Sequence, residues 1–142
     1  MFKLIRNGIS IWNDLKKPSK RNTEKPMYQI IHNGKPKSIY TFKITNFIEK
    51  INNLIIKNNL DDETGLRFVN KRGISTFGLR TRVDIILCNF NQNIIDIYEN
   101  VKPQKMTHYH EDARFIYIFI GGFVDRHNIQ LNDVFVGKKV KD

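Results

Sequence analysis

The chain has 142 residues, a mass of 16.8 kDa and a formal net charge of +10. This length suits one domain with a single hydrophobic core, and the 40% share of hydrophobic residues excludes a disordered or collagen-like chain. The one cysteine, Cys88, cannot form an internal disulfide, and no run of about 20 apolar residues could span a membrane. We therefore predict a basic globular protein of the cytoplasm.

The positive charge is concentrated at the N-terminal end. Residues 1–50 carry 11 Lys and Arg against three acidic residues, a net charge of +8, whereas residues 51–142 have a net charge of +2. Residues 16–26 are polar, charged and bracketed by Pro18 and Pro26, which is typical of a linker, so we predict a basic extension and linker at 1–26. Because these cations lie on a leader segment rather than on a structured face with aromatic residues, we do not expect nucleic acid as a partner.

The first part of this extension has a second interpretation. Apolar residues at helical spacing within Phe2–Lys17 could form a cationic amphipathic helix that contacts a membrane surface. Gly8 and several asparagines disfavour this helix. We therefore prefer an extension that packs onto the domain or frays at its end.

The domain itself is predicted to occupy residues 27–137 and to be followed by a polar tail at 138–142. Short apolar runs on both sides of Asn33-Gly34 predict a hairpin, because this dipeptide is a strong tight-turn signal. Apolar residues with a 3.6-residue period then predict one helix at about 45–58, with Thr45 as its N-cap.

After residue 65 the apolar residues recur with a period of two, which predicts strands. The expected strands lie at residues 66–68, 74–77, 83–87, 94–98, 115–120 and 129–136. Because no helices separate them, they favour antiparallel pairing. The predicted fold class is mainly β, an antiparallel sandwich or jelly-roll-like barrel with one helix.

Several runs in this region resemble a known family. They are STFGLRTRVDIIL at 75–87, NIIDIYENVKP at 93–103, ARFIYIFIGG at 113–122, and residues 129–133. Their order and spacing are similar to the DUF192 family of bacteria and archaea, also called UPF0127. The residues that fall where the family pattern expects them are Phe77, Asp84, Pro103, Gly122 and Asp133.

The resemblance covers residues 38–137 and marks a divergent member. The positions that depart from the pattern are Ser75, Leu79, Arg82 and Asn132, where His, Met, Pro and Gly are usual. What the resemblance implies is a compact, mostly β fold with a helix and no established biochemical activity. It therefore implies a fold, and the function has to be argued from the site.

Asp84 is the first candidate site residue because it interrupts an apolar strand. A buried carboxylate needs hydrogen-bond donors or a raised pKa. The preferred interpretation is a structural clamp that accepts hydrogen bonds from backbone or arginine groups. The alternatives are a binding pocket formed by Asp84, Thr76, Arg80 and Arg82, with Asp84 as ligand anchor or general base, and a solvent-facing position with no role.

A second candidate is a histidine cluster. His108 and His110 are two residues apart and would share one face of an extended segment, as a metal site on a β scaffold requires. His127 could supply a third ligand. An exposed polar loop is the simpler interpretation of the segment with His108 and His110.

Cys88 lies in an apolar strand, and we interpret it as an inert core residue.

These observations favour a small binding or accessory module for a small molecule or a protein surface, with no cofactor. The alternative is a metal-dependent, cupin-like enzyme or hydrolase that uses His108, His110 and His127. The sequence favours a binding module over an enzyme, without deciding between them.

Overall fold

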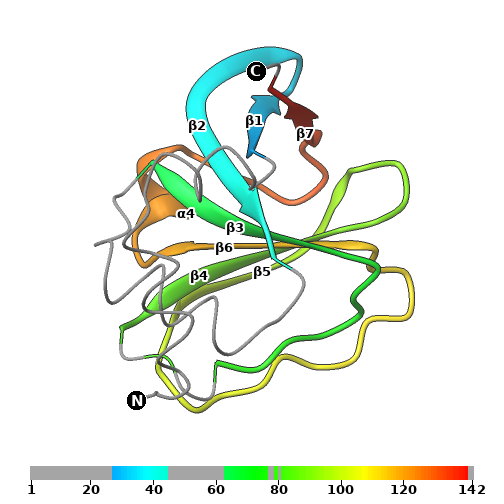
Figure 1. Cartoon of the computed structure of the whole chain (residues 1–142). Coiled ribbons are helices and arrows are strands. Elements are labelled where there is room, and N and C mark those ends of the chain that lie inside the picture. The colour runs from blue at the N-terminus through cyan, green and yellow to red at the C-terminus, as the bar shows by residue number, and fades with distance from the viewer. Residues whose placement is uncertain (1–26, 45–62, 77–78, 80, 141–142) are drawn as a thin grey trace, which may run out of the picture.

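The protein folds as one curved, mainly β sheet (Figure 1). The computed structural model describes residues 27–44, 63–76, 79 and 81–140. Its elements are β1 (Met27–His32), β2 (Lys35–Lys43), β3 (Thr64–Val69), β4 (Val83–Cys88), β5 (Ile94–Val101), β6 (Phe115–Ile120), α4 (Phe123–Arg126) and β7 (Phe135–Lys139). The mainly β prediction is confirmed. The extension at 1–26 and the helix expected at about 45–58 lie outside the described residues.

The seven strands pair in the order β5-β4-β6-β3-β2-β1-β7. Five of the six neighbouring pairs are antiparallel, but β2 and β3 are parallel, with Tyr40 opposite Thr64 and Lys43 opposite Arg67. The expectation of antiparallel strands is wrong for this pair. A parallel pair needs a connection of about a dozen residues or more, and the long stretch between Lys43 and Thr64 is sufficient.

Two predicted strands also need correction. The segment expected as a strand at 74–77 is irregular in its described part, with only an isolated bridge between Ser75 and Met106. The strand expected at 129–136 starts later and ends later, because Asp133 Oδ2 accepts the Gln130 N–H at 2.9 Å and closes a turn. β7 continues through Lys139, so the polar tail does not begin at 138.

The central strands β4 and β6 are buried on both faces, which explains their almost continuous apolar sequences. One face, here called the outer face, carries a cluster of Ile44, Leu66, Phe68, Ile74, Leu79, Val83, Ile85, Leu87, Ala113, Ile116 and Ile118. The opposite, inner face carries a cluster of Ile30, Ile39, Ile86, Cys88, Ile94, Tyr117, Phe119, Phe123, Val124, Ile129 and Phe135.

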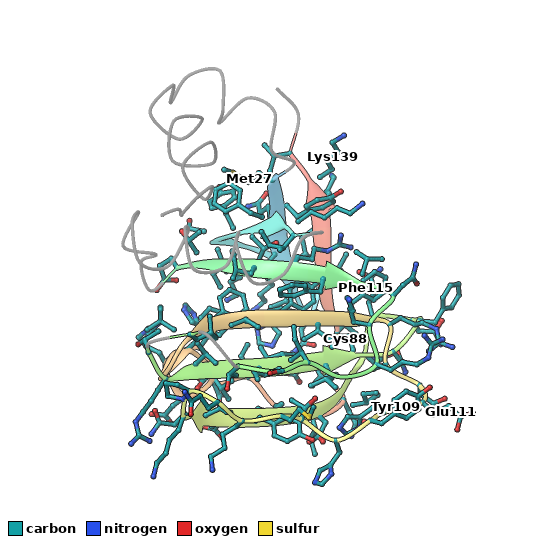
Figure 2. The ribbon with its side chains drawn as sticks, turned by 60° about the horizontal axis from the view of Figure 1, so that its bottom comes forward. Met27, Cys88, Tyr109, Glu111, Phe115 and Lys139 are labelled. Carbon is teal, nitrogen blue, oxygen red and sulfur yellow. The ribbon has the colours of Figure 1, made fainter. Side chains whose placement is uncertain are left out.

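The inner face is concave because the two edges of the sheet approach each other. The Ile94 N–H, at the start of β5, donates to the Asp133 carbonyl at 2.9 Å, and the Phe135 N–H, at the start of β7, donates to the Gln92 carbonyl at 2.9 Å. Residues of both edge strands therefore enter one core cluster. Figure 2 shows the strands stacked from β1 and β7 down to β5, with side chains filling the space between them.

Candidate functional site

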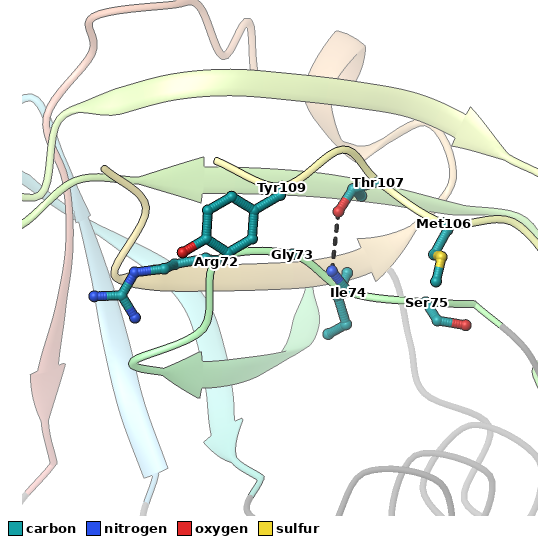
Figure 3. Close-up of a pocket in the computed structure, with 7 residues that line it drawn as sticks. All are labelled: Arg72, Gly73, Ile74, Ser75, Met106, Thr107 and Tyr109. Atoms are coloured by element: carbon teal, nitrogen blue, oxygen red, sulfur yellow. Dashed lines mark hydrogen bonds between the residues drawn. The ribbon is translucent and has the colours of Figure 1, made fainter. Parts of the chain in front are cut away.

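An open groove of about 600 Å³ lies between residues 72–75 and residues 106–109 (Figure 3). It lies next to the outer-face cluster, to which Ile74 belongs. The residues that line it are Arg72, Gly73, Ile74, Ser75, Met106, Thr107 and Tyr109.

Backbone hydrogen bonds hold the two walls of the groove together. The Thr107 N–H donates to the Ile74 carbonyl at 2.9 Å, and the His110 N–H donates to the Arg72 carbonyl at 2.7 Å. The Thr107 side chain adds a third bond, since its Oγ1 accepts the Ile74 N–H at 2.9 Å. The groove is therefore preformed, as small binding sites usually are.

Thr76 anchors one end of this arrangement. It is almost completely buried, and its Oγ1 accepts the Lys105 N–H at 2.7 Å and donates to the Lys102 carbonyl at 2.9 Å. Thr76 therefore positions the chain that leads into Met106. The sequence marked Thr76 as a candidate, but as a neighbour of Asp84 rather than of this groove.

The other end of the groove rests on a polar network. Tyr98 Oη accepts the His108 N–H at 3.2 Å and lies 2.9 Å from His110 Nε2. The same His110 nitrogen lies 3.2 Å from Asp96 Oδ2. His110 is therefore held by side chains of β5, and this fixes the course of the segment that carries Tyr109.

None of the residues that line the groove was a candidate site residue in the sequence, and Met106 and Tyr109 are the most conspicuous of them. Their exposed fractions are 71% and 74%, which is high for large apolar side chains. They lie in an irregular segment, where neither the helical nor the strand period applies. The signal available in the sequence was a methionine and a tyrosine in an otherwise polar stretch.

Asp84 is completely buried and lies outside this groove. Its Oδ1 accepts the Asn100 N–H at 2.7 Å, and its Oδ2 accepts the Val124 N–H at 2.8 Å and the Gly122 N–H at 3.2 Å. One carboxylate on β4 thus joins β5 to the beginning of α4. With backbone donors on both oxygens, the geometry is that of a structural clamp.

Of the four residues of the candidate Asp84 pocket, the described ones, Thr76 and Arg82, make no hydrogen bond to Asp84 and have other partners. Thr76 bonds to the 102–105 segment, and the Arg82 side chain is exposed while its carbonyl accepts the Gly121 N–H at 3.0 Å. Arg80 lies outside the described residues.

The three histidines are separated. His108 is exposed, and His110 packs beside Tyr98. His127 follows α4, with its ring 4.5 Å from Phe123 and its Nε2 2.9 Å from Glu63 Oε1. Within the described part of the chain, no three His, Cys, Asp or Glu residues are placed to hold a metal ion.

Cys88 lies inside the inner cluster with no exposed surface. Burial raises the pKa of its thiol to about 12, and the nearby positive charge of Arg67 only partly opposes this shift. The thiol is therefore protonated at neutral pH and is a poor nucleophile.

Comparisons with known proteins give information about the fold but not about the function. No family model and no curated protein matches the sequence. Nor does any helix among the described residues have the length and hydropathy to cross a membrane.

Two solved structures are similar in fold. One is a protein of unknown function from Novosphingobium aromaticivorans DSM 12444, with 16% identity, a TM-score of 0.61, and coverage of 78% of this chain and 83% of that chain. The other is described as a "putative transcription regulator" from Sinorhizobium meliloti 1021, with 15% identity, a TM-score of 0.63, and coverage of 80% and 93%. Similarity at this level of identity shows a shared mainly β fold.

Proposed function

We propose that this protein is a divergent member of the DUF192 family and acts as a binding module rather than an enzyme. In this proposal the groove between residues 72–75 and 106–109 receives an apolar side chain of a partner polypeptide. The observation that carries the proposal is the exposure of Met106 and Tyr109 on walls that hydrogen bonds already hold in place.

The composition of the groove supports a protein partner. Arg, Met and Tyr are enriched in protein interfaces, and the groove presents Arg72, Met106 and Tyr109. Methionine adapts its shape to different partners, and tyrosine gives a large contact area at a small cost in side-chain entropy. A small-molecule pocket usually buries about 70–90% of its ligand, and this open groove fits a surface contact better.

Two of the residues that carry the family resemblance support the assignment to DUF192. Asp84 accepts a hydrogen bond from the Gly122 N–H, and Gly122 has a φ of +100°, a conformation that favours glycine. The matching pattern therefore has a physical role in this fold. Asp84 and Gly122 do not line the groove. This agrees with a family resemblance that implies a fold and no established activity.

We do not propose the metal-dependent enzyme, since His108, His110 and His127 do not converge. The binding proposal can be tested by selecting random linear peptides displayed on phage against the immobilised protein. Selected peptides should contain an aliphatic or aromatic anchor residue. Their affinity, measured by calorimetry, should fall at least about tenfold for the double variant Met106→Ser/Tyr109→Ser, because hot-spot truncations typically cost more than about 1 kcal/mol.

The matched control replaces an equally exposed apolar residue away from the groove. Phe90 is 78% exposed in the turn between β4 and β5, and Phe90→Ser should leave the affinity unchanged. Peptides that bind the double variant as tightly as the original protein would overturn the proposal. So would the recovery of no apolar peptide at all.

A further inference from the structure

Arg67 of β3 is a cation inside the inner face of the sheet. Only 7% of its surface is exposed. Its Nε donates to Tyr117 Oη at 3.3 Å, and its guanidinium carbon lies 4.3 Å from the centre of the Tyr28 ring and 5.1 Å from that of the Phe115 ring. Two strands distant in sequence, β1 and β6, thus supply a polar contact and two aromatic faces to one arginine.

A buried charge is normally compensated by an opposite charge, because moving it out of water is costly. Among the described residues, no carboxylate forms an ion pair with Arg67. The nearby weak acids cannot supply the negative charge either. Burial raises the pKa values of Tyr117 and Cys88 to about 12, against a smaller lowering by Arg67, so both side chains are neutral at pH 7.

The two Nη groups of the guanidinium are the part of Arg67 that could meet a ligand. In the described part of the chain, Nη1 and Nη2 of Arg67 donate no hydrogen bond to another residue. Among the described residues, the fully enclosed side-chain polar atoms without a hydrogen bond belong to Gln92 and His127, so the Nη groups of Arg67 are not fully enclosed. The Nη edge of the guanidinium has the fork shape that matches a carboxylate or phosphate group.

The residues around the guanidinium of Arg67 pack tightly against it. Gly137 of β7 lies against it, and a Cβ at this position would be 2.8 Å from Arg67 Nε and 3.1 Å from Tyr117 Oη. A side chain at residue 137 would therefore displace the arginine. The two aromatic rings and the glycine hold the guanidinium of Arg67 in one orientation before a ligand binds. This lowers the entropy cost of binding.

The surrounding strands add positive charge. β1, β2 and β7 contain five lysines and no Asp or Glu. Lys43 is the register partner of Arg67 on the neighbouring strand, and Lys139 is the register partner of Tyr28. Cations side by side on one face repel each other, and an anion bound between them relieves this repulsion.

We propose that Arg67, assisted by Lys43 and Lys139, forms an anion-binding site for the oxyanion group of a small molecule. The group would be a carboxylate or a phosphate, held by the two Nη donors. A single guanidinium between the Tyr28 and Phe115 rings suits one oxyanion group better than a continuous nucleic-acid backbone. The site is separate from the groove of Met106 and Tyr109 and does not depend on it.

The test is an NMR titration of ¹⁵N-labelled protein with inorganic phosphate and, separately, with acetate. Saturable shifts of the Arg67 Nε–Hε and Gly137 amide signals are expected with at least one of them, and the stronger anion identifies the class. Arg67→Met should abolish the saturable shift of the Gly137 amide, because Met fills the space without a charge. Lys43→Met should weaken the binding several-fold, and Arg82→Met, a change of an exposed arginine outside the site, should have no effect.

A second measurement covers the case in which Arg67→Met perturbs folding. The anion that binds should raise the melting temperature of the original protein and of Arg82→Met, but raise that of Lys43→Met less. The absence of saturable shifts with both anions would overturn the proposal. So would binding of a single-stranded oligonucleotide alone, with equal losses on removal of any one lysine of the three strands.

Discussion

Replacing Asp84 by asparagine tests the clamp that joins β4, β5 and α4. The substitution keeps the shape of the side chain but turns one of its two acceptors into a donor. If the amide oxygen faces Gly122 and Val124, the NH₂ group meets the Asn100 N–H, so two donors oppose each other beside a completely buried side chain. The reverse orientation leaves two backbone donors without an acceptor.

The expected loss of stability follows from these contacts. Each buried donor left unpaired costs about 1–3 kcal/mol, and the remaining bonds lose the strengthening that the charge provides. We expect Asp84→Asn to lower the free energy of unfolding by about 3–5 kcal/mol, a large share of the roughly 5–15 kcal/mol that a domain of this kind possesses. For a chain of this length this is a decrease of roughly 10–17 °C in melting temperature.

Urea denaturation followed by circular dichroism measures this difference. Asp125→Asn is the matched control, because Asp125 is an exposed aspartate on α4, and it should change stability by less than about 0.5 kcal/mol. A loss below about 1 kcal/mol for Asp84→Asn would refute the clamp reasoning. It would show that the three backbone donors find other partners and would reopen a ligand-binding role for this carboxylate.

Three further outcomes follow from the described contacts. Burial opposes ionisation of Asp133, but hydrogen bonds from His32 and two further donors hold its pKa below the ordinary value of 3.8. Its stabilising effect is therefore complete above pH 3.8 and lost as the pH falls through the lower folded value, and Asp133→Asn should flatten the acid side of a pH–stability curve. Thr76→Val should cost about 1–3 kcal/mol in urea denaturation, since it removes the acceptor of the Lys105 N–H, and it should weaken peptide binding in the groove. Unchanged stability and affinity would contradict the anchoring role of Thr76. The Cys88 thiol should react with Ellman's reagent only when the protein unfolds, and immediate reaction of the native protein would show that it is accessible.

The sequence by itself determined the mainly β class and the approximate ranges of several strands. Period-two patterns are local properties of the chain, and β4, β5 and β6 lie close to the predicted ranges for that reason. The sequence also marked Asp84 as a residue that needs donors, because a carboxylate in a buried strand has few stable arrangements. It could not name those donors, since they come from β5 and from the beginning of α4.

Only the tertiary structure decided which distant segments meet. The parallel pairing of β2 with β3, the two walls of the groove and the three hydrogen bonds of Asp84 all join residues far apart in the chain. Arg67 is the clearest case, because in sequence it is one more charged residue in an alternating strand. Its burial arises from rings on β1 and β6 and from a glycine on β7, and contacts of this kind are created only when the sheet curves and its edges come together.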